Sequence, residues 1–248
     1  MDLEFRSGGG APAAGQAFQF PGAGEVHLWL LPLDAETRVH GECVLSVSES
    51  GRAAGFRSPA DASRFVISHA YLRRILAGYL RANPGDLLFS VSEFGKPSLP
   101  HAEGGPDLRF NMAHSGDAAL VAVSAEGQIG VDLEAVRPLD DLYAVARRCF
   151  SPRELDLLHS CDEPACTDMF YTFWTRKEAY VKARGNGMSL DLPRIDTSAA
   201  PAVLDGRWHV RDIGMYRGCR CALASENPVT RVRMAEGIPL VTPGNRGM

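Results

Sequence analysis

The chain has 248 residues, 45% of them hydrophobic and 23% charged, with a formal net charge of −4 at pH 7. This length can bury one large core or two smaller ones, and the balanced charge argues against a general nucleic-acid binder, which usually has a strongly basic face. No apolar run approaches the roughly 20 residues that span a bilayer, and the N-terminus lacks the regions of a secretory signal. We therefore expect a cytoplasmic protein that binds neither nucleic acid nor membrane.

The cysteines fit no standard zinc-binding pattern, and Cys161 and Cys166 form only a loose pair without a suitably spaced histidine. We expect ordinary buried or free thiols in a reducing compartment. The six are Cys43, Cys149, Cys161, Cys166, Cys219 and Cys221.

The first part of the chain predicts a leader, a strand and a long helix. Residues 1–24 are rich in Gly, Ala and Pro and are expected to be a mobile leader. Alternating apolar residues predict a strand from Glu25, and apolar residues at helical spacing predict a helix from about Pro59 to Ala82. The sequence Asn83-Pro84-Gly85 ends that helix, and residues 87–92 read as a short strand.

The second part repeats this alternation of strands and helices. Apolar runs predict strands at 110–112, 119–124 and 127–134, helices at about 140–149, 151–160 and 165–184, and a strand-rich region at 189–210 and 215–225. The order predicts an α+β fold of two similar halves, residues 25–126 and 127–236, followed by a loose tail at 237–248.

Two acids share one face of a predicted strand. Asp132 and Glu134 are two residues apart in an otherwise apolar segment, so their side chains leave the same side. A hard divalent cation with oxygen ligands would offset the cost of placing both charges there. The alternative is a solvent-facing strand edge.

A third acid lies on the predicted helix at 165–184. Trp174, Glu178 and Lys182 recur every four residues and therefore share one face, with Lys177 beside Glu178. The alternative is a surface ion pair between Glu178 and Lys182 next to a core tryptophan.

Basic and hydroxyl side chains are scattered over separate segments. Gathered in space, they would suit a polyphosphate ligand, although each could equally be an ordinary surface group. No nucleotide-binding P-loop or dinucleotide fingerprint follows a strand. The candidates are Arg52, Arg64, Lys96, His114 and Ser115.

Three blocks in this order resemble the 4′-phosphopantetheinyl transferase superfamily: EFGKP leading to FNMAHSG at 93–116, IGVDLE at 129–134, and FWTRKEAYVKARGNGMSL at 173–190. The length is similar to that of the Sfp-type members, which hold two halves in one chain. The resemblance implies two α/β halves in a pseudo-twofold arrangement, with the active site at their interface.

The resemblance also implies residue roles. Asp132, Glu134 and Glu178 match the family's Mg²⁺ ligands, with Mn²⁺ as a possible substitute, and coenzyme A is the substrate. Glu178 and Lys182 match catalytic positions, and Glu178 or a metal-bound water would accept the proton of the carrier serine. The matched coenzyme positions are Arg52, Arg64, Lys96, His114, Ser115, Lys177 and Lys182.

The implied reaction moves 4′-phosphopantetheine from coenzyme A to a serine of an acyl or peptidyl carrier protein, by a monomeric enzyme that releases 3′,5′-ADP. Because carriers present an acidic helix, the apolar and basic segment Val136–Phe150 is a candidate docking surface. Two alternatives stay open: a Mg²⁺-dependent nucleotide phosphohydrolase, and a non-catalytic protein that binds coenzyme A or a carrier. The carrier and its pathway are not identified by the sequence.

Overall fold

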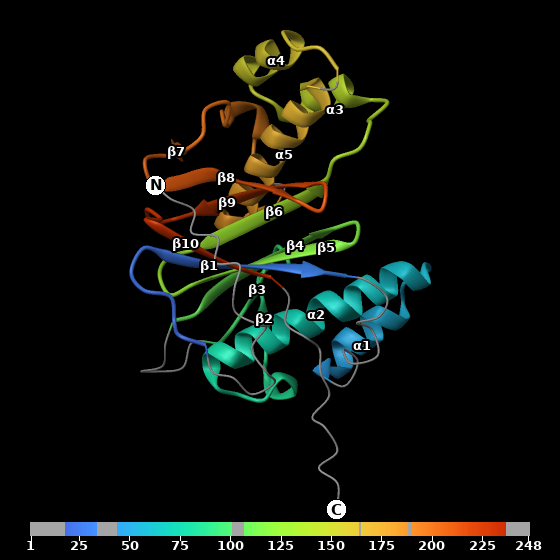
Figure 1. Cartoon of the computed structure of the whole chain (residues 1–248), viewed down its shortest axis with the longest axis vertical. Coiled ribbons are helices and arrows are strands. Elements are labelled where there is room, and N and C mark those ends of the chain that lie inside the picture. The colour runs from blue at the N-terminus through green and yellow to red at the C-terminus, as the bar shows by residue number, and fades with distance from the viewer. Residues whose placement is uncertain (1–17, 34–43, 101–106, 164, 188–189, 237–248) are drawn as a thin grey trace, which may run out of the picture.

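Two four-stranded sheets lie between two long helices (Figure 1). The computed structural model describes residues 18–33, 44–100, 107–163, 165–187 and 190–236. The first sheet has the order β10 (Arg231–Glu236), β1 (Glu25–Pro32), β5 (Ala118–Ser124), β4 (Arg109–Ser115). The second has the order β6 (Ile129–Ala135), β9 (Cys219–Ser225), β8 (Trp208–Tyr216), β7 (Ala202–Leu204). The expected α+β architecture is confirmed.

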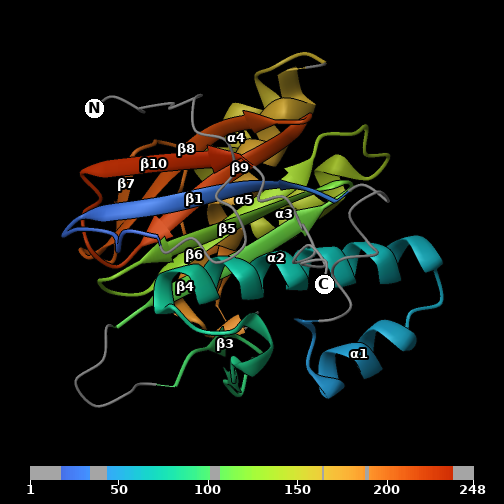
Figure 2. The same cartoon turned by 60° about the horizontal axis from the view of Figure 1, so that its bottom comes forward.

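Alternation along the strands builds three layers of core. On β1, Val26, Leu28 and Leu30 pack into a cluster shared with β6 and β9 of the other sheet. Trp29 and Leu31 point the other way, against helix α2 (Pro59–Leu80). On the outer face of the second sheet, α5 (Ala165–Arg184) packs through small residues against β8 and β9. Figure 2 shows α2 crossing the outer face of the first sheet.

The remaining elements are short. α3 (Leu142–Cys149) and α4 (Pro152–His159) pack beside the start of α5, and the hairpin β2 (Ser90–Val91) with β3 (Pro97–Ser98) follows α2. Single-turn 3₁₀ helices occupy Pro84–Asp86 and Leu192–Arg194. Within the described ranges, no helix combines the length and apolar character that crossing a bilayer requires.

The predicted helices at 59–82, 140–149, 151–160 and 165–184 are confirmed to within two residues. Helix α1 (Val47–Ala54) was not predicted, because none of its residues is buried and the segment therefore has no apolar stripe. A capping box formed by Ser46 and Glu49 begins this helix. The strand expected at 87–92 is reduced to the two residues of β2.

Two ends of the described chain differ from expectation. β10, assigned by sequence to the second half, pairs in parallel with β1 of the first sheet. Of the leader, residues 1–17 lie outside the described residues, as do Cys43 and the tail 237–248. Phe18 is held in place, since its N–H donates to the Gly78 carbonyl at 3.0 Å and its ring lies 4.8 Å from Trp29.

Candidate active site

The site is built where β6 crosses α5. Ile129, Val131 and Leu133 fill the core between the sheets, so Gly130, Asp132 and Glu134 face α5 on the other side. Gly130 has no room for a side chain, because a Cβ would strike the backbone of α5. This close approach brings the acids of the strand to the helix that carries Glu178 and Lys182.

Asp132 is the most buried of the three acids, with 2% of its surface exposed. Lys182 Nζ donates to its Oδ1 at 2.5 Å, whereas its buried Oδ2 has no hydrogen-bond partner among the described residues. Burial raises the pKa of Asp132 to about 7; Lys182 opposes this shift, and the charges of Glu134 and Glu178 add to it. Lys182 therefore compensates the charge of this carboxylate only in part, and one of its oxygens is left without a hydrogen-bond donor among the described residues.

Glu134 and Glu178 complete the cluster. Ser115 on β4 donates to Glu134 Oε2 at 2.8 Å and accepts from the Ala135 N–H at 3.1 Å. Glu178 is half-buried, and burial followed by the charge of Glu134 raises its pKa, against the effect of Lys182. Among the described residues, no group of three or more acids, histidines or cysteines already has the arrangement of a metal site. The predicted ligands are neighbours, but their side chains do not converge on one point.

Asn111 is a residue that sequence reasoning missed. Its side chain is buried, with 6% exposed, and its Oδ1 accepts from the Val131 N–H at 2.8 Å, one residue before Asp132. With Ser115 it joins β4 of the first sheet to β6 of the second. Its place in the FNMAHSG block, three residues before His114, was the available signal.

Arg52 and His114, two of the predicted phosphate ligands, lie near His69 on α2. The charges of Arg52 and His114 both lower the pKa of His69, after the larger effect of burial, which brings it to about 4. His69 stacks on Phe65 with ring centroids 3.8 Å apart, and the Arg52 guanidinium lies 5.0 Å from the same ring. Desolvation and then the charge of Lys182 lower the pKa of His114, although its side chain reaches solvent. The first half thus presents a basic group toward Lys182.

Arg64 is half-buried and forms ion pairs with two acids. It donates to Asp117 Oδ1 from Nε at 2.9 Å and from the guanidinium at 2.8 Å, and to Asp61 at 3.1 Å. Two acids therefore balance its charge, so contact with a phosphate would require these pairs to open.

Lys96, predicted to lie along the coenzyme, makes its hydrogen bonds within the protein. Its ammonium donates to Gln128 Oε1 at 3.1 Å, to the Ile129 carbonyl at 3.1 Å and to the Ala183 carbonyl at 2.9 Å. Burial lowers the pKa of Lys96 to about 8. All three donor positions of the ammonium are taken, so it ties the β2–β3 hairpin to β6 and α5.

Lys177, also predicted to contact the coenzyme, is likewise bound to groups of the protein. Its side chain is 1% exposed, and Nζ forms an ion pair with Glu154 Oε2 at 2.9 Å and donates to the carbonyls of Leu192, at 2.8 Å, and Ile195. Glu154 is itself fully buried and accepts from Thr197. The motif's first lysine therefore ties α4 and the 192–197 segment to α5, on the side of the helix away from solvent.

Comparison with known proteins agrees with this geometry. A model of the 4′-phosphopantetheinyl transferase superfamily matches residues 128–207, which contain Asp132, Glu134, Glu178 and Lys182. The chain is 41% identical over 206 residues to the 4′-phosphopantetheinyl transferase HetI of Nostoc sp. strain PCC 7120, covering 81% of this chain and 87% of that protein. The chain belongs to the 4′-phosphopantetheinyl transferase superfamily.

More distant members of the superfamily are also similar. The 4′-phosphopantetheinyl transferase Sfp of Bacillus subtilis is 31% identical over 161 residues, covering 65% of this chain and 69% of Sfp. A human L-aminoadipate-semialdehyde dehydrogenase-phosphopantetheinyl transferase is 28% identical, covering 63% of this chain and 53% of that protein. The expected resemblance to Sfp-type members of the superfamily is confirmed.

The segment Val136–Phe150, predicted to dock the carrier, contains both buried and exposed residues. Leu142 and Phe150 are buried in the core beneath α3, so they are unavailable to a partner. Tyr143 is 37% exposed, and Arg147 and Arg148 are exposed on the same helix. Arg137 is exposed too, so the segment offers a partner its exposed tyrosine and arginines but not its buried apolar residues.

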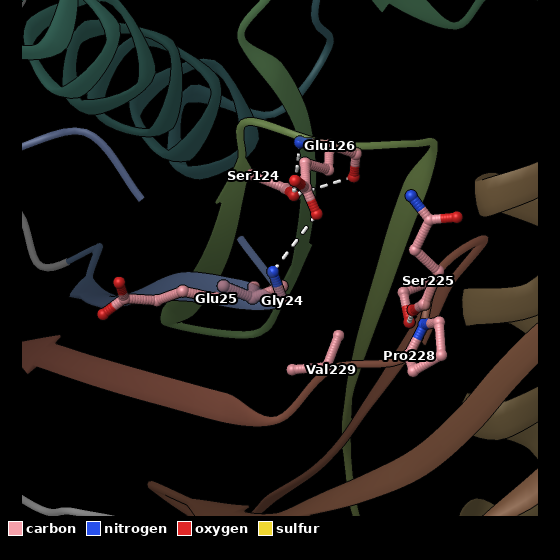
Figure 3. A pocket seen from close by; sticks show the side chains of 9 residues that line it. Gly24, Glu25, Ser124, Glu126, Ser225, Pro228 and Val229 are labelled. Carbon is pink, nitrogen blue, oxygen red and sulfur yellow. Dashed lines mark hydrogen bonds between the residues drawn. The ribbon is translucent and has the colours of Figure 1, made fainter. Parts of the chain in front are cut away.

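A small pocket elsewhere holds none of the predicted site residues (Figure 3). It lies where β1 begins and β5 and β9 end, and the Gly24 N–H donates to Glu126 Oε2 there at 3.2 Å. Its lining contains two glutamates among small polar and apolar residues: Gly24, Glu25, Val26, Ser124, Glu126, Ser225, Asn227, Pro228 and Val229. The chemistry of the superfamily is better matched by the acids on β6 and α5.

Proposed function

We propose that this chain transfers the 4′-phosphopantetheine of coenzyme A to a serine of an apo acyl or peptidyl carrier protein, releasing 3′,5′-ADP. The observation that carries the proposal is Asp132, whose one oxygen binds Lys182 and whose other is buried without a partner among the described residues. Membership of the superfamily, with Asp132, Glu134, Glu178 and Lys182 all inside the matched region, supports it.

The same carboxylates are proposed to hold Mg²⁺, with Mn²⁺ as a substitute. The fit rests on donor chemistry: Asp132, Glu134 and Glu178 offer only oxygen ligands. Burial raises the pKa of Asp132 and of Glu178, and the charges of the neighbouring acids add to it, so a bound cation would offset both costs. When bound, the ion would neutralise charge on the coenzyme's pyrophosphate.

The chain's own residues divide the remaining work. Lys182 lies next to Asp132 and would bind the phosphates where charge grows on the leaving 3′,5′-ADP. His114 and Arg52, whose charges both act on His69, would bind the 3′-phosphate of the coenzyme. Glu178, whose pKa burial raises, is suited to accept the proton of the carrier serine, directly or through water.

The carrier would dock beside α3. Tyr143, Arg147 and Arg148 offer an apolar ring and two positive charges to an acidic carrier helix. We further propose that the enzyme is a monomer and that its halves are related by a pseudo-twofold axis. The latter is supported by the two four-stranded sheets, each of which carries one long helix on its outer face, although β10 of the second half completes the first sheet.

Mass measurement of a carrier tests the function. Incubation of the chain with coenzyme A, Mg²⁺ and an apo carrier should add the phosphopantetheine arm to the carrier. Asp132→Ala and Glu134→Ala should abolish the addition, whereas Asp156→Ala, an exposed acid on α4, should not. An unmodified carrier with release of nucleotide would instead indicate a hydrolase, and neither product would indicate a binding protein.

Docking is tested separately by Tyr143→Asp. This exposed residue can be changed without disturbing the core, unlike Leu142. The KM for the carrier should rise several-fold while the Kd for coenzyme A stays the same. Unaltered carrier kinetics would place the docking surface elsewhere.

A further inference from the structure

Two cysteines meet at the junction of α4 and α5. Cys161 follows the end of α4, Cys166 is the second residue of α5, and their Sγ atoms are 2.7 Å apart. A disulfide bond is about 2.04 Å long, so about 0.7 Å of further approach would join them. From Cys166 to Glu178 the helix rises about 18 Å, so this pair is separate from the carboxylate cluster.

Surrounding groups hold both sulfur atoms in place. Cys161 Sγ donates to the Leu158 carbonyl at 3.1 Å, and Cys166 Sγ to the Cys161 carbonyl at 2.5 Å. The Tyr143 hydroxyl donates to Cys166 Sγ at 3.7 Å. Cys166 is 1% exposed and Cys161 is half-buried, so Cys161 is the sulfur that a small molecule in solution can reach.

A metal site does not explain the pair. A structural zinc ion needs four ligands, and among the described residues no third acid, histidine or cysteine joins the two thiols. The nearby His159 ring instead stacks on Tyr143, with centroids 5.2 Å apart. Reaction of the two thiols with each other is therefore the chemistry that this junction supports.

We propose that Cys161 and Cys166 form a reversible intramolecular disulfide, with a low-molecular-weight disulfide as the oxidant. The deprotonated Cys161 sulfur attacks one sulfur of the oxidant and releases one thiol. Cys166 then loses its proton and attacks the Cys161 sulfur, so that the protein disulfide forms and the second thiol leaves. Two protein thiols are oxidised and one small disulfide is reduced to two thiols; an added dithiol reverses the exchange.

The exchange is slow at neutral pH. Burial, followed by the hydrogen bond and charge of Cys166, raises the pKa of Cys161 to about 11, and the charge of Glu163 adds to this. Besides Cys166 and Glu163, the titratable group facing the pair is Tyr143 of α3. Because the thiolate is the nucleophile, the rate should rise nearly tenfold per pH unit below the pKa of Cys161. The site thus responds to a sustained oxidising shift rather than to a brief one.

The test uses the full chain with excess oxidised glutathione at mildly alkaline pH, followed by alkylation and mass spectrometry. The wild-type chain should lose about 2 Da, and a non-reduced digest should contain the Cys161–Cys166 link. Cys149→Ser should behave like wild type, and a dithiol should restore both thiols. Cys161→Ser, with Cys161→Ala as a second variant in case one misfolds, should abolish the loss.

Two results would overturn the inference. One is a wild-type chain that stays fully alkylatable, or that gains glutathione on single cysteines without the 2 Da loss. The other is a loss of about 2 Da that persists in both Cys161 variants, because a different pair would then be responsible. Circular dichroism of each variant verifies that it is folded.

Discussion

Gly130 lies so close to α5 that a Cβ in its place would stand 2.2 Å from the carbonyl oxygen of Ala179. The same atom would also lie 2.2 Å from the Ala183 nitrogen. Both neighbours are backbone atoms of a long helix, which cannot rotate aside as a side chain can. The absence of a single methyl group therefore sets the distance between the acids of β6 and those of α5.

Gly130→Ala should push α5 away from β6. We expect a loss of about 2–4 kcal/mol in the free energy of unfolding, together with loss of transferase activity, because overpacking here displaces backbone. Urea denaturation and carrier modification measure the two effects. Gly51→Ala, on exposed helix α1 with nothing within 4 Å of its Cβ, is the matched control and should stabilise by about 0.5–1 kcal/mol. Equal behaviour of the two variants would contradict the packing argument.

Two lysines on α5 should separate stability from activity. Lys177→Met breaks a fully buried ion pair with Glu154 and should cost about 3–5 kcal/mol of unfolding free energy. Lys182→Met, whose side chain is 31% exposed, should cost only about 1 kcal/mol but lower kcat by about 100-fold or more. Thermal melts of both variants measure the loss of stability, and carrier kinetics measure the loss of activity. A Lys177 variant that keeps its melting temperature and loses coenzyme binding would restore its expected role as a phosphate ligand.

Lys96→Met tests whether this lysine supports the fold or touches the coenzyme. Its removal leaves the carbonyls of Ile129 and Ala183 without their donor and should lower the free energy of unfolding by about 1–3 kcal/mol. The KM for coenzyme A should change less than it does on replacing His114. An increased KM with unaltered stability would indicate direct contact with the coenzyme.

His69 should make the protein sensitive to acid. Its folded-state pKa is about 4 against a usual value near 6.5, so the unfolded chain binds the extra proton between these values. The stability that this group contributes is full above pH 6.5 and is lost as pH falls toward 4. Because the ring is partly exposed, the loss is on the order of 2 kcal/mol.

His69→Gln should remove most of that loss. Urea denaturation at pH 7.5 and at pH 4.5 should give wild type a larger drop than the variant. Parallel curves for the two proteins would mean that other groups govern the acid transition.

The sequence identified the acids because their chemistry is local. Asp132 and Glu134 share a strand face by simple alternation, and Glu178 and Lys182 share a helix face by spacing. Periodicity likewise located the helices α2, α3, α4 and α5. These features depend on neighbours within one turn or one strand.

The roles of Lys96 and Lys177 could not be predicted in this way. Both occur in the motifs that carry the resemblance, yet their partners, Ala183 and Glu154, are far away in the chain or on another helix. The same holds for Asn111, whose acceptor oxygen finds its donor on the other sheet. A motif indicates which residues matter, whereas burial and partners decide whether they bind a ligand or the protein itself.

The parallel pairing of β10 with β1 has a consequence for synthesis on the ribosome. β1 precedes every other described strand and β10 follows them all. β1 is therefore synthesised first, and the edge that pairs with β10 stays unpaired until all the other described strands have been made. During that interval its outer edge offers free N–H and C=O groups to any strand nearby. The nascent first half is therefore the stage at which this chain is most prone to aggregate, and neither half is expected to be soluble when expressed alone.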